Sequence, residues 1–256
     1  MIATTDRGLA YGDGVFETIA VHNGIAQQLD RHIARLTEGC LRLGFTAPPL
    51  VDDIRDRAAG HARAVLKVIV TRGEGGRGYR PPADPVPTRV ISLHAWPTHD
   101  PAWAERGVAV RWCETRLAIQ PALARLKHLN RLEQVLARAE WEGMDRWQEG
   151  LMQDMDGHVI EAIQANVFVV TDGRLRTPRV DRCGIAGITR ERVIEGAAEL
   201  GLVCEEARFD QSAVGAADEL FLCNSVIGIW PVREVSSVSF DAPGPVTRTL
   251  QAWLEQ

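Results

Sequence analysis

Apolar residues recur with two different periods in the first half of the chain. Alternation with a period of two predicts three strands, at residues 15–21, 64–70 and 88–96. Recurrence at helical spacing predicts two helices, at residues 30–44 and about 51–62. We expect Asp30 to cap the first helix and Gly44 to end it. The sequence His22-Asn23-Gly24, directly after the first strand, is typical of a hairpin turn.

The second half shows the same two patterns. They predict strands at residues 107–113, 166–171 and 219–223, and helices at residues 130–141, 189–200 and 246–254. The helix at 130–141 carries one apolar stripe, formed by Leu132, Val135, Leu136 and Ala139. We expect Thr189 to cap the next helix. The sequence at 154–157, Asp-Met-Asp-Gly, lacks the rest of the EF-hand spacing, so it predicts a hairpin turn and not a calcium loop.

Two irregular segments interrupt these patterns. Residues 6–14 are rich in glycine and aspartate, and we expect a loop there. Residues 96–101, with two prolines, are the candidate linker between a smaller domain at residues 1–98 and a larger one at residues 99–256. The mixture of strands and helices on both sides of this linker predicts an α/β (α+β) protein.

Composition narrows the class of protein. The formal net charge of -5 argues against general nucleic-acid binding. The five cysteines are scattered and odd in number, without a Cys-x-x-Cys pair, which indicates reduced thiols and no zinc site. No apolar run approaches the roughly 20 residues that a membrane-spanning helix needs. The N-terminal residues contain no signal-peptide core. From the cysteine pattern we expect a cytoplasmic protein.

Only two of the basic side chains are lysines, Lys67 and Lys127. An arginine can replace a lysine in most surface roles, but its guanidinium stays protonated and cannot form a Schiff base. A chain so poor in lysine keeps one where the amine itself is needed. Lys67 lies in a strand whose alternation points it away from Leu66 and Val68, and Lys127 precedes a helix. The alternative for either lysine is a solvated side chain.

Four other features suggest ligand contacts. Arg31 and Arg35 lie one helical turn apart, either as a solvated basic face or with one arginine turned toward an anion. Residues 71–80 combine four glycines, three arginines and a tyrosine, which suits a carboxylate ligand or, as an Arg-Gly patch, RNA. Glu161 is either a buried carboxylate that needs a partner or an edge residue that points to water. The helix start near Thr189 offers backbone N–H groups to phosphate.

Several of these segments together resemble the fold-type IV pyridoxal-phosphate enzymes, which include branched-chain and D-amino-acid aminotransferases. The resemblance covers nearly the whole chain. The general pattern is carried by YGDGVFE at residues 11–17, HIARL at 32–36, Glu161 with NVF at 166–168, and GITR at 187–190. Within the family, KVIVTRGEGGRGY at residues 67–79 and KHLNRLEQVL at 127–136 are similar to the aminodeoxychorismate lyases.

The resemblance implies a two-domain fold with mixed sheets and flanking helices, whose larger domain binds pyridoxal 5'-phosphate. Lys127 would be the Schiff-base lysine. Glu161 would keep the pyridine nitrogen of the cofactor protonated, so that the ring accepts electrons. Arg35 would hold the cofactor phosphate. Further phosphate contacts would come from the backbone N–H groups of Ile188 and Thr189 and from Ser225.

The same resemblance implies an activity and partners. Arg77 and Tyr79 match the loop that receives a substrate carboxylate in related enzymes. The reaction would convert 4-amino-4-deoxychorismate to p-aminobenzoate and pyruvate in folate biosynthesis, in a homodimer without a metal. A D-amino-acid or branched-chain aminotransferase on the same fold is the alternative. A third interpretation is a cofactor-free binding protein, or an RNA-binding module that uses residues 71–80.

Overall fold

The chain forms two compact units. The computed structural model describes residues 2–143 and 146–256. The first unit comprises Met1–Pro97 and Leu126–Arg131, and the second comprises Thr98–Arg125 and Leu132–Gln256. The chain therefore enters the first unit twice. Within the described residues, no helix is both long and apolar enough to cross a membrane.

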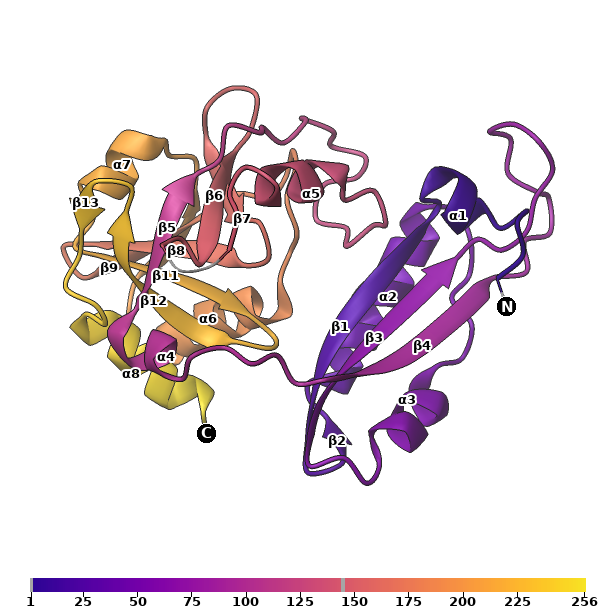
Figure 1. Cartoon of the computed structure of the whole chain (residues 1–256), viewed down its shortest axis with the longest axis horizontal. Coiled ribbons are helices and arrows are strands. Elements are labelled where there is room, and N and C mark those ends of the chain that lie inside the picture. Colours follow the sequence, from indigo (N-terminus) through magenta and orange to yellow (C-terminus); the bar gives the residue numbers. More distant parts are fainter. Residues whose placement is uncertain (1, 144–145) are drawn as a thin grey trace. The chain divides into compact units, whose positions relative to one another are not determined.

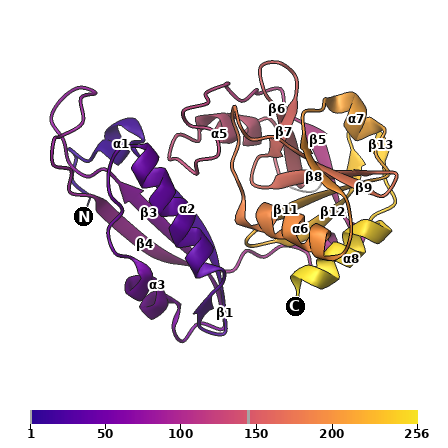
Figure 2. The same ribbon diagram turned by 180° about the vertical axis from the view of Figure 1, so that it is seen from behind.

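The first unit is a small sheet with helices on one face. Its elements are α1 (Arg7–Tyr11), β1 (Gly14–His22), β2 (Ile25–Ala26), α2 (Leu29–Arg42), α3 (Val51–Ala58), β3 (Arg63–Thr71) and β4 (Thr88–Ala95). The four strands are antiparallel in the order β2-β1-β3-β4, and α2 and α3 cover one face (Figures 1 and 2). The core between the sheet and the two helices includes Val15, Ile19, Leu36, Cys40 and Ile54.

Most of the pattern predicted for this unit is confirmed. The strands β1, β3 and β4 match the three predicted strands. Asn23 and Gly24 take positive φ angles of 51° and 77° in the hairpin turn between β1 and β2. The predicted cap of α2 is wrong, because Gln28 takes the N-cap position in a left-handed conformation (φ 52°). Asp30 therefore lies inside the first turn of the helix.

The loop expected at residues 6–14 contains the short helix α1. Asp6 caps this helix by accepting a hydrogen bond from Gly8 N (2.8 Å), and Gly12 closes it in the left-handed region (φ 66°). The aspartate and the glycine that suggested a loop are thus the two ends of a helix. The helix α3 also differs from its prediction and ends at Ala58, because Ala59 takes an extended conformation.

The second unit is built on a larger mixed sheet. Its strands are β5 (Val108–Trp112), β6 (Glu149–Gln153), β7 (Val159–Ala162), β8 (Asn166–Thr171), β9 (Arg174–Pro178), β10 (Cys204–Ala207), β11 (Glu219–Asn224), β12 (Gly228–Val235) and β13 (Val238–Ser239). Its helices are α4 (Ala102–Arg106), α5 (Leu132–Arg138), α6 (Ile188–Glu199), α7 (Gln211–Gly215) and α8 (Pro245–Leu254). The strand order is β10-β9-β8-β11-β12-β5-β6-β7, with β13 on β12.

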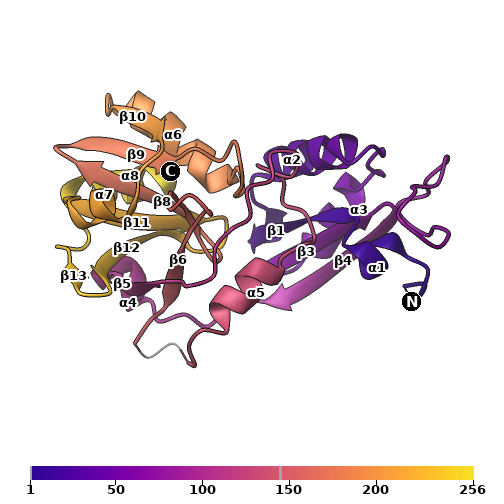
Figure 3. The ribbon, with the colours of Figure 1, turned by 90° about the horizontal axis from the view of Figure 1, so that it is seen from above.

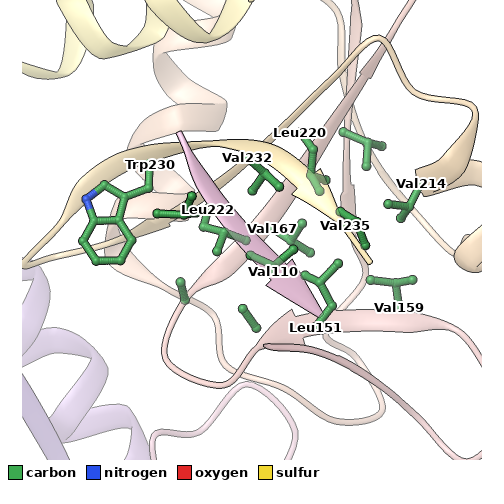
Figure 4. Packing of buried hydrophobic residues seen from close by; sticks show 14 of the residues in the cluster. Val110, Leu151, Val159, Val167, Val214, Leu220, Leu222, Trp230, Val232 and Val235 are labelled. Carbon is green, nitrogen blue, oxygen red and sulfur yellow. The ribbon is translucent and has the colours of Figure 1, made fainter. Parts of the chain in front are cut away.

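Three apolar clusters lie in the described part of this unit, and two of them contain side chains of β8 and β11. The first collects side chains from β5 to β8, β11 and β12, among them Val110, Leu151, Val167, Leu222 and Val232 (Figure 4). The second lies beneath α6 and α8, which pack against each other on the same side of the sheet (Figures 1 and 3). The mixture of sheets and helices in both units confirms the predicted α/β class.

The strands predicted at 166–171 and 219–223 are confirmed, whereas β6, β7, β9, β10, β12 and β13 were not foreseen. The helix expected at 130–141 covers only Leu132–Arg138. Its apolar stripe does not join the core, since Leu132, Val135 and Leu136 are 75%, 59% and 60% exposed. Periodicity identified the residues that share a face of α5 but not the surroundings of that face.

The helix α8 is capped by a residue from the sheet. Its N-cap, Gly244, has no side chain to offer, and the carboxylate of Glu219 takes that role. Glu219 accepts hydrogen bonds from Val246 N (3.0 Å), Thr247 N (2.8 Å) and Thr247 Oγ1 (2.6 Å). A Cβ atom at Gly244 would lie 2.2 Å from Glu219, so the glycine allows this close approach. The start of β11 and the start of α8 are therefore joined by one buried carboxylate.

The substitution Glu219→Ala should lower the free energy of unfolding by about 3 kcal/mol, because it leaves buried N–H donors without an acceptor. Asp210 is a matched control, since it caps the exposed start of α7 by accepting from Ser212 N and Ala213 N. Asp210→Ala should cost only about 1 kcal/mol. Urea unfolding of both variants measures the difference. Equal losses would contradict the view that burial makes the Glu219 cap the more important one.

Candidate functional site

The segment that contains Lys127 is attached to the edge of β1. Phe16 N donates a hydrogen bond to Lys127 O (2.9 Å), and Leu129 N donates to Gly14 O (3.0 Å). An antiparallel bridge lies between these two bonds. Residues 127–129 therefore extend the sheet, and this pairing fixes the backbone from which the Lys127 side chain starts.

Both lysines of the chain lie close to the ring of Phe16. Lys127 Nζ is 4.5 Å and Lys67 Nζ is 5.5 Å from the ring centroid. Lys67 is exposed while Leu66 and Val68 are buried, which confirms the orientation predicted from the alternation. Lys127 is half-buried. An aromatic face attracts a nearby ammonium group, so Phe16 helps to orient both side chains.

On the core face of β1, Glu17 is buried beneath α2. One of its oxygens accepts a hydrogen bond from Arg35 Nε (2.8 Å), and the other lies 2.5 Å from Arg35 Nη2 and 2.6 Å from His32 Nδ1. Burial alone would raise the pKa of Glu17, but the Arg35 charge and the hydrogen bonds from His32 and Arg35 lower it to about 2. Arg35 is therefore held in one orientation by a charged carboxylate.

The neighbouring Arg31 has a different environment. It lines a surface hollow of about 550 Å³ together with Gln28, Asp30 and Arg55. This hollow contains none of the residues predicted to contact cofactor or substrate. Of the two arginines one turn apart, only Arg35 turns toward the carboxylate of β1.

Residues 71–80, the Arg-Gly loop, contain arginines in two kinds of environment. Arg72 is buried and donates from Nε (2.7 Å) and Nη2 (3.1 Å) to the carboxylate of Asp13. Arg77 and Tyr79 are exposed, and the Tyr79 ring lies 5.3 Å from the ring of Tyr11. The loop is thus held at its start, and its tip presents a guanidinium and a phenol to solvent.

In the second unit, Glu161 is buried in β7, at 3% exposure. The interpretation as an edge residue that points to water is therefore wrong. Its Oε2 accepts a hydrogen bond from Ile185 N (2.8 Å), and Ile185 O accepts one from Asn166 Nδ2 (2.9 Å). The segment around Ile185 is further tied to Arg125, whose N donates to Gly184 O (2.9 Å). These bonds hold the Glu161 carboxylate in a defined position.

The helix α6 begins one residue before the position predicted for its cap. Gly187 is the N-cap and Ile188 the first helical residue, so Thr189 lies in the first turn. A Cβ atom at Gly187 would lie 1.9 Å from Asn166 Oδ1, which explains why no capping side chain is present. Since no side chain caps this helix start, its first N–H groups suit an anionic ligand.

Ser225 lies in the turn that follows β11. Asn224 shapes this turn, because its Oδ1 accepts hydrogen bonds from Val226 N (2.9 Å) and Ile227 N (3.0 Å). Its Nδ2 donates to Gln164 O (2.9 Å), which lies in the connection between β7 and β8. The Ser225 hydroxyl is thus attached to a turn with a fixed backbone.

The aspartate-rich turn between β6 and β7 brings Asp154, Asp156 and His158 within 4.8 Å of one another. Asp154 Oδ1 accepts hydrogen bonds from Asp156 N (3.0 Å) and His158 N (2.9 Å), and Asp156 pairs with Arg182 (2.6 Å). These bonds are those of a turn, and the predicted hairpin is confirmed.

Several residues that shape these sites were not predicted from the sequence, namely Asp13, Glu17, His32, Asn166 and Asn224. Glu17 gave a usable signal, since it occupies a core-facing position of a strand where the pattern calls for an apolar residue. The others act through contacts between residues far apart in the chain, which no local pattern encodes.

Comparison with known proteins supports the resemblance drawn from the sequence. The chain is 39% identical over 258 residues to an aminodeoxychorismate lyase from Vibrio harveyi, which covers 96% of this chain and 93% of the relative. The crystal structure of 4-amino-4-deoxychorismate lyase from Pseudomonas aeruginosa matches with a TM-score of 0.95 and 45% identity, over 100% of this chain and 94% of that one. The branched-chain amino acid aminotransferase of Escherichia coli matches with a TM-score of 0.85 and 26% identity, over 98% and 87%.

The family of the chain follows from a broader comparison. The model of the family described as amino-transferase class IV matches residues 14–235, from the start of β1 to the end of β12. This span includes both lysines, Glu17 with its partners His32 and Arg35, Glu161, and the start of α6. The chain therefore belongs to the class IV amino-transferase family.

Proposed function

We propose that the protein is a pyridoxal-phosphate-dependent lyase that converts 4-amino-4-deoxychorismate to p-aminobenzoate and pyruvate. The observation that carries this proposal is the full-length likeness to the Pseudomonas aeruginosa lyase, at 45% identity and a TM-score of 0.95. The E. coli aminotransferase shares the fold at 26% identity, so the lyase is the better supported activity. The reaction would belong to folate biosynthesis, and a cytoplasmic location stays a prediction from the cysteine pattern.

The residues present fit this cofactor. The primary amine of Lys127 matches its aldehyde, and the buried carboxylate of Glu161 matches its pyridine nitrogen. The helix start at Ile188 and Thr189, which has no capping side chain, matches its phosphate. Arg35 would provide a positive charge for the phosphate. The Ser225 hydroxyl would donate a hydrogen bond to it. When bound, the cofactor supplies an electron sink for the carbon that loses a proton.

Lys127 also has the proton-transfer role in this proposal. As a neutral amine, its Nζ takes the proton from the ring carbon that bears the substrate amine. The enolpyruvyl group then leaves from the neighbouring carbon, the ring becomes aromatic, and Nζ donates a proton to the departing group. Phe16, which lies 4.5 Å from Nζ, would limit the directions in which the amine can move.

The first test of this function is a product assay with a synthetic substrate. The cofactor-loaded protein should release p-aminobenzoate and pyruvate in equal amounts from 4-amino-4-deoxychorismate. Efficient amino transfer from D-alanine or leucine, with no pyruvate from the chorismate derivative, would favour the aminotransferase instead. A purified protein that binds no pyridoxal phosphate would contradict both.

The substitution Lys127→Ala should abolish covalent cofactor binding and turnover, because only a primary amine can form the bond to the cofactor aldehyde. Lys67→Arg is the matched control and should leave both nearly unchanged. Borohydride reduction followed by peptide mapping identifies the modified lysine independently of turnover. A label on Lys67 would show that the assignment of the two lysines is reversed.

The apolar stripe of α5 supports a further proposal, a two-fold homodimer. Leu132, Val135 and Leu136 are exposed on one face of a helix that directly follows the Lys127 segment. Contiguous exposed apolar side chains are typical of surfaces that contact another protein. In a homodimer, the same stripe of a second copy could cover this face.

Val135→Glu should therefore weaken the dimer at least tenfold, because a glutamate buried at the interface would lack a partner. The control is Val203→Glu, since Val203 is 52% exposed, close to the 59% of Val135, but lies outside α5. Light scattering or sedimentation at micromolar concentration measures the mass of each variant. A wild-type protein that is monomeric and fully active under these conditions would contradict the dimer.

Arg77→Ala should lower kcat/KM for the lyase reaction about 10- to 150-fold, the worth of a charge-assisted hydrogen bond to a substrate carboxylate. The cofactor spectrum should not change, and Arg77→Lys should restore activity only in part, since the fork geometry is lost. Arg89→Ala is the control, because Arg89 is half-exposed on β4 and pairs with Asp53. Wild-type kcat/KM in Arg77→Ala would show that the loop does not contact the substrate.

A further inference from the structure

One buried arginine holds the backbone of the Arg-Gly loop. Arg7 is 4% exposed, and its guanidinium donates hydrogen bonds to the carbonyl oxygens of Gly78 (3.2 Å), Tyr79 (3.0 Å) and Arg80 (3.4 Å). Its Nε donates to Asp13 Oδ2 (2.8 Å). Three consecutive carbonyl groups thus converge on a single side chain from another part of the chain.

This convergence is informative because the loop has little stiffness of its own. Glycine has the widest conformational freedom of any residue, and residues 73–78 contain four glycines. Gly78 takes a φ of +90°, which side chains rarely adopt. A Cβ atom at Gly75 would lie 2.8 Å from Arg7 Cδ, so the loop also packs closely on the aliphatic stem of Arg7. The glycines let the backbone wrap around Arg7, and Arg7 selects one conformation.

Tyr11 provides a second tie to the same turn. Gly78 N donates a hydrogen bond to the Tyr11 hydroxyl (3.2 Å), and the Tyr11 ring lies 5.3 Å from the Tyr79 ring. The Arg7 guanidinium lies 4.9 Å from the centroid of the Tyr11 ring. Both the N–H and the carbonyl group of Gly78 are therefore held by residues of α1.

Arg7, the anchor of the loop, is itself held in place by other residues. Arg7 N donates to Gly73 O (2.9 Å), and Asp13 accepts from Arg72 as well as from Arg7. Burial would raise the pKa of Asp13, but the hydrogen bonds from Arg72 and Arg7 outweigh it and lower the pKa. Asp13 therefore stays charged near neutral pH and keeps both guanidinium groups in place.

We propose that Arg7 is a positioning residue for the substrate. By holding the carbonyl groups of residues 78–80, it arranges the Arg77 and Tyr79 side chains in advance to receive a substrate carboxylate. The inference rests on the proposed function of the loop. Arg7 touches neither substrate nor cofactor in this scheme, and it acts by removing the conformational freedom that the loop would otherwise lose on binding.

The first variant is Arg7→Lys, which keeps the charge beside Asp13 but cannot serve three carbonyl groups and a carboxylate at once. KM for 4-amino-4-deoxychorismate should rise about 5- to 20-fold, while kcat changes less than about twofold. The rise in KM is smaller than the full effect expected for loss of the Arg77 contact, because the Arg77 side chain is still present. The control is Arg111→Lys, because Arg111 also donates to two carbonyl groups and pairs with Glu140. The control should keep the wild-type KM.

A double-mutant cycle separates positioning from a general structural role. If Arg7 acts through Arg77, Arg7→Lys should raise KM less than about twofold in an Arg77→Ala background, because no guanidinium remains to be positioned. Effects that simply multiply, or a wild-type KM in Arg7→Lys, would overturn the proposal. If Arg7→Lys does not fold, the same cycle is run with Tyr11→Phe, which removes only the hydroxyl that accepts from Gly78 N.

Hydrogen exchange tests the anchor without any substrate. The amide of Gly78 should exchange at least tenfold faster in Arg7→Lys than in the wild type, and Arg111→Lys should leave it unchanged. An unchanged Gly78 amide in Arg7→Lys would overturn the proposed anchor. Failure of the lyase activity itself would show differently, as a wild-type protein that releases no p-aminobenzoate while its Gly78 amide still responds to Arg7→Lys.

Discussion

A carboxylate that is buried without a partner is strongly unfavourable, and this constraint organises the first unit around Glu17. Glu17 lies on the core face of β1 and is satisfied by His32 and Arg35, three residues apart on one face of α2. The pairing fixes the rotation and the register of α2 on the sheet. The alternation of β1 then places Phe16 on the other face, where both lysines approach its ring. The strand β1 thus determines both the orientation of Arg35 and the surroundings of Lys127.

The sequence predicted best what burial determines. The strands β1, β3 and β8 were foreseen because a buried face requires apolar residues at fixed intervals. Helix starts were predicted less well, since the N-cap positions of α2 and α6 are taken by Gln28 and Gly187 and not by Asp30 and Thr189. At Gly187 the close approach of Asn166 decides the residue, and a local preference for a capping side chain has no influence on it.

The candidate site divides in a similar way. Lys127 and Glu161 could be proposed from the sequence because a rare amine and a carboxylate among apolar residues are conspicuous by type. Arg7 and Asn224 could not, because each acts on backbone groups that are distant in the chain or hidden in a turn. A backbone carbonyl has no signature in the sequence, so residues that shape a site through the main chain become visible only in the fold.

The second, brief entry of the chain into the first unit has a consequence for how the protein is made. The edge of β1 at residues 14–16 pairs with residues 127–129, which are synthesised more than a hundred residues later. During translation the first unit therefore waits with an open strand edge, of the kind that recruits strands from other chains. A gene fragment that stops at Pro97 would keep that edge permanently open. Although the unit is compact in space, it is not an independent segment of the gene.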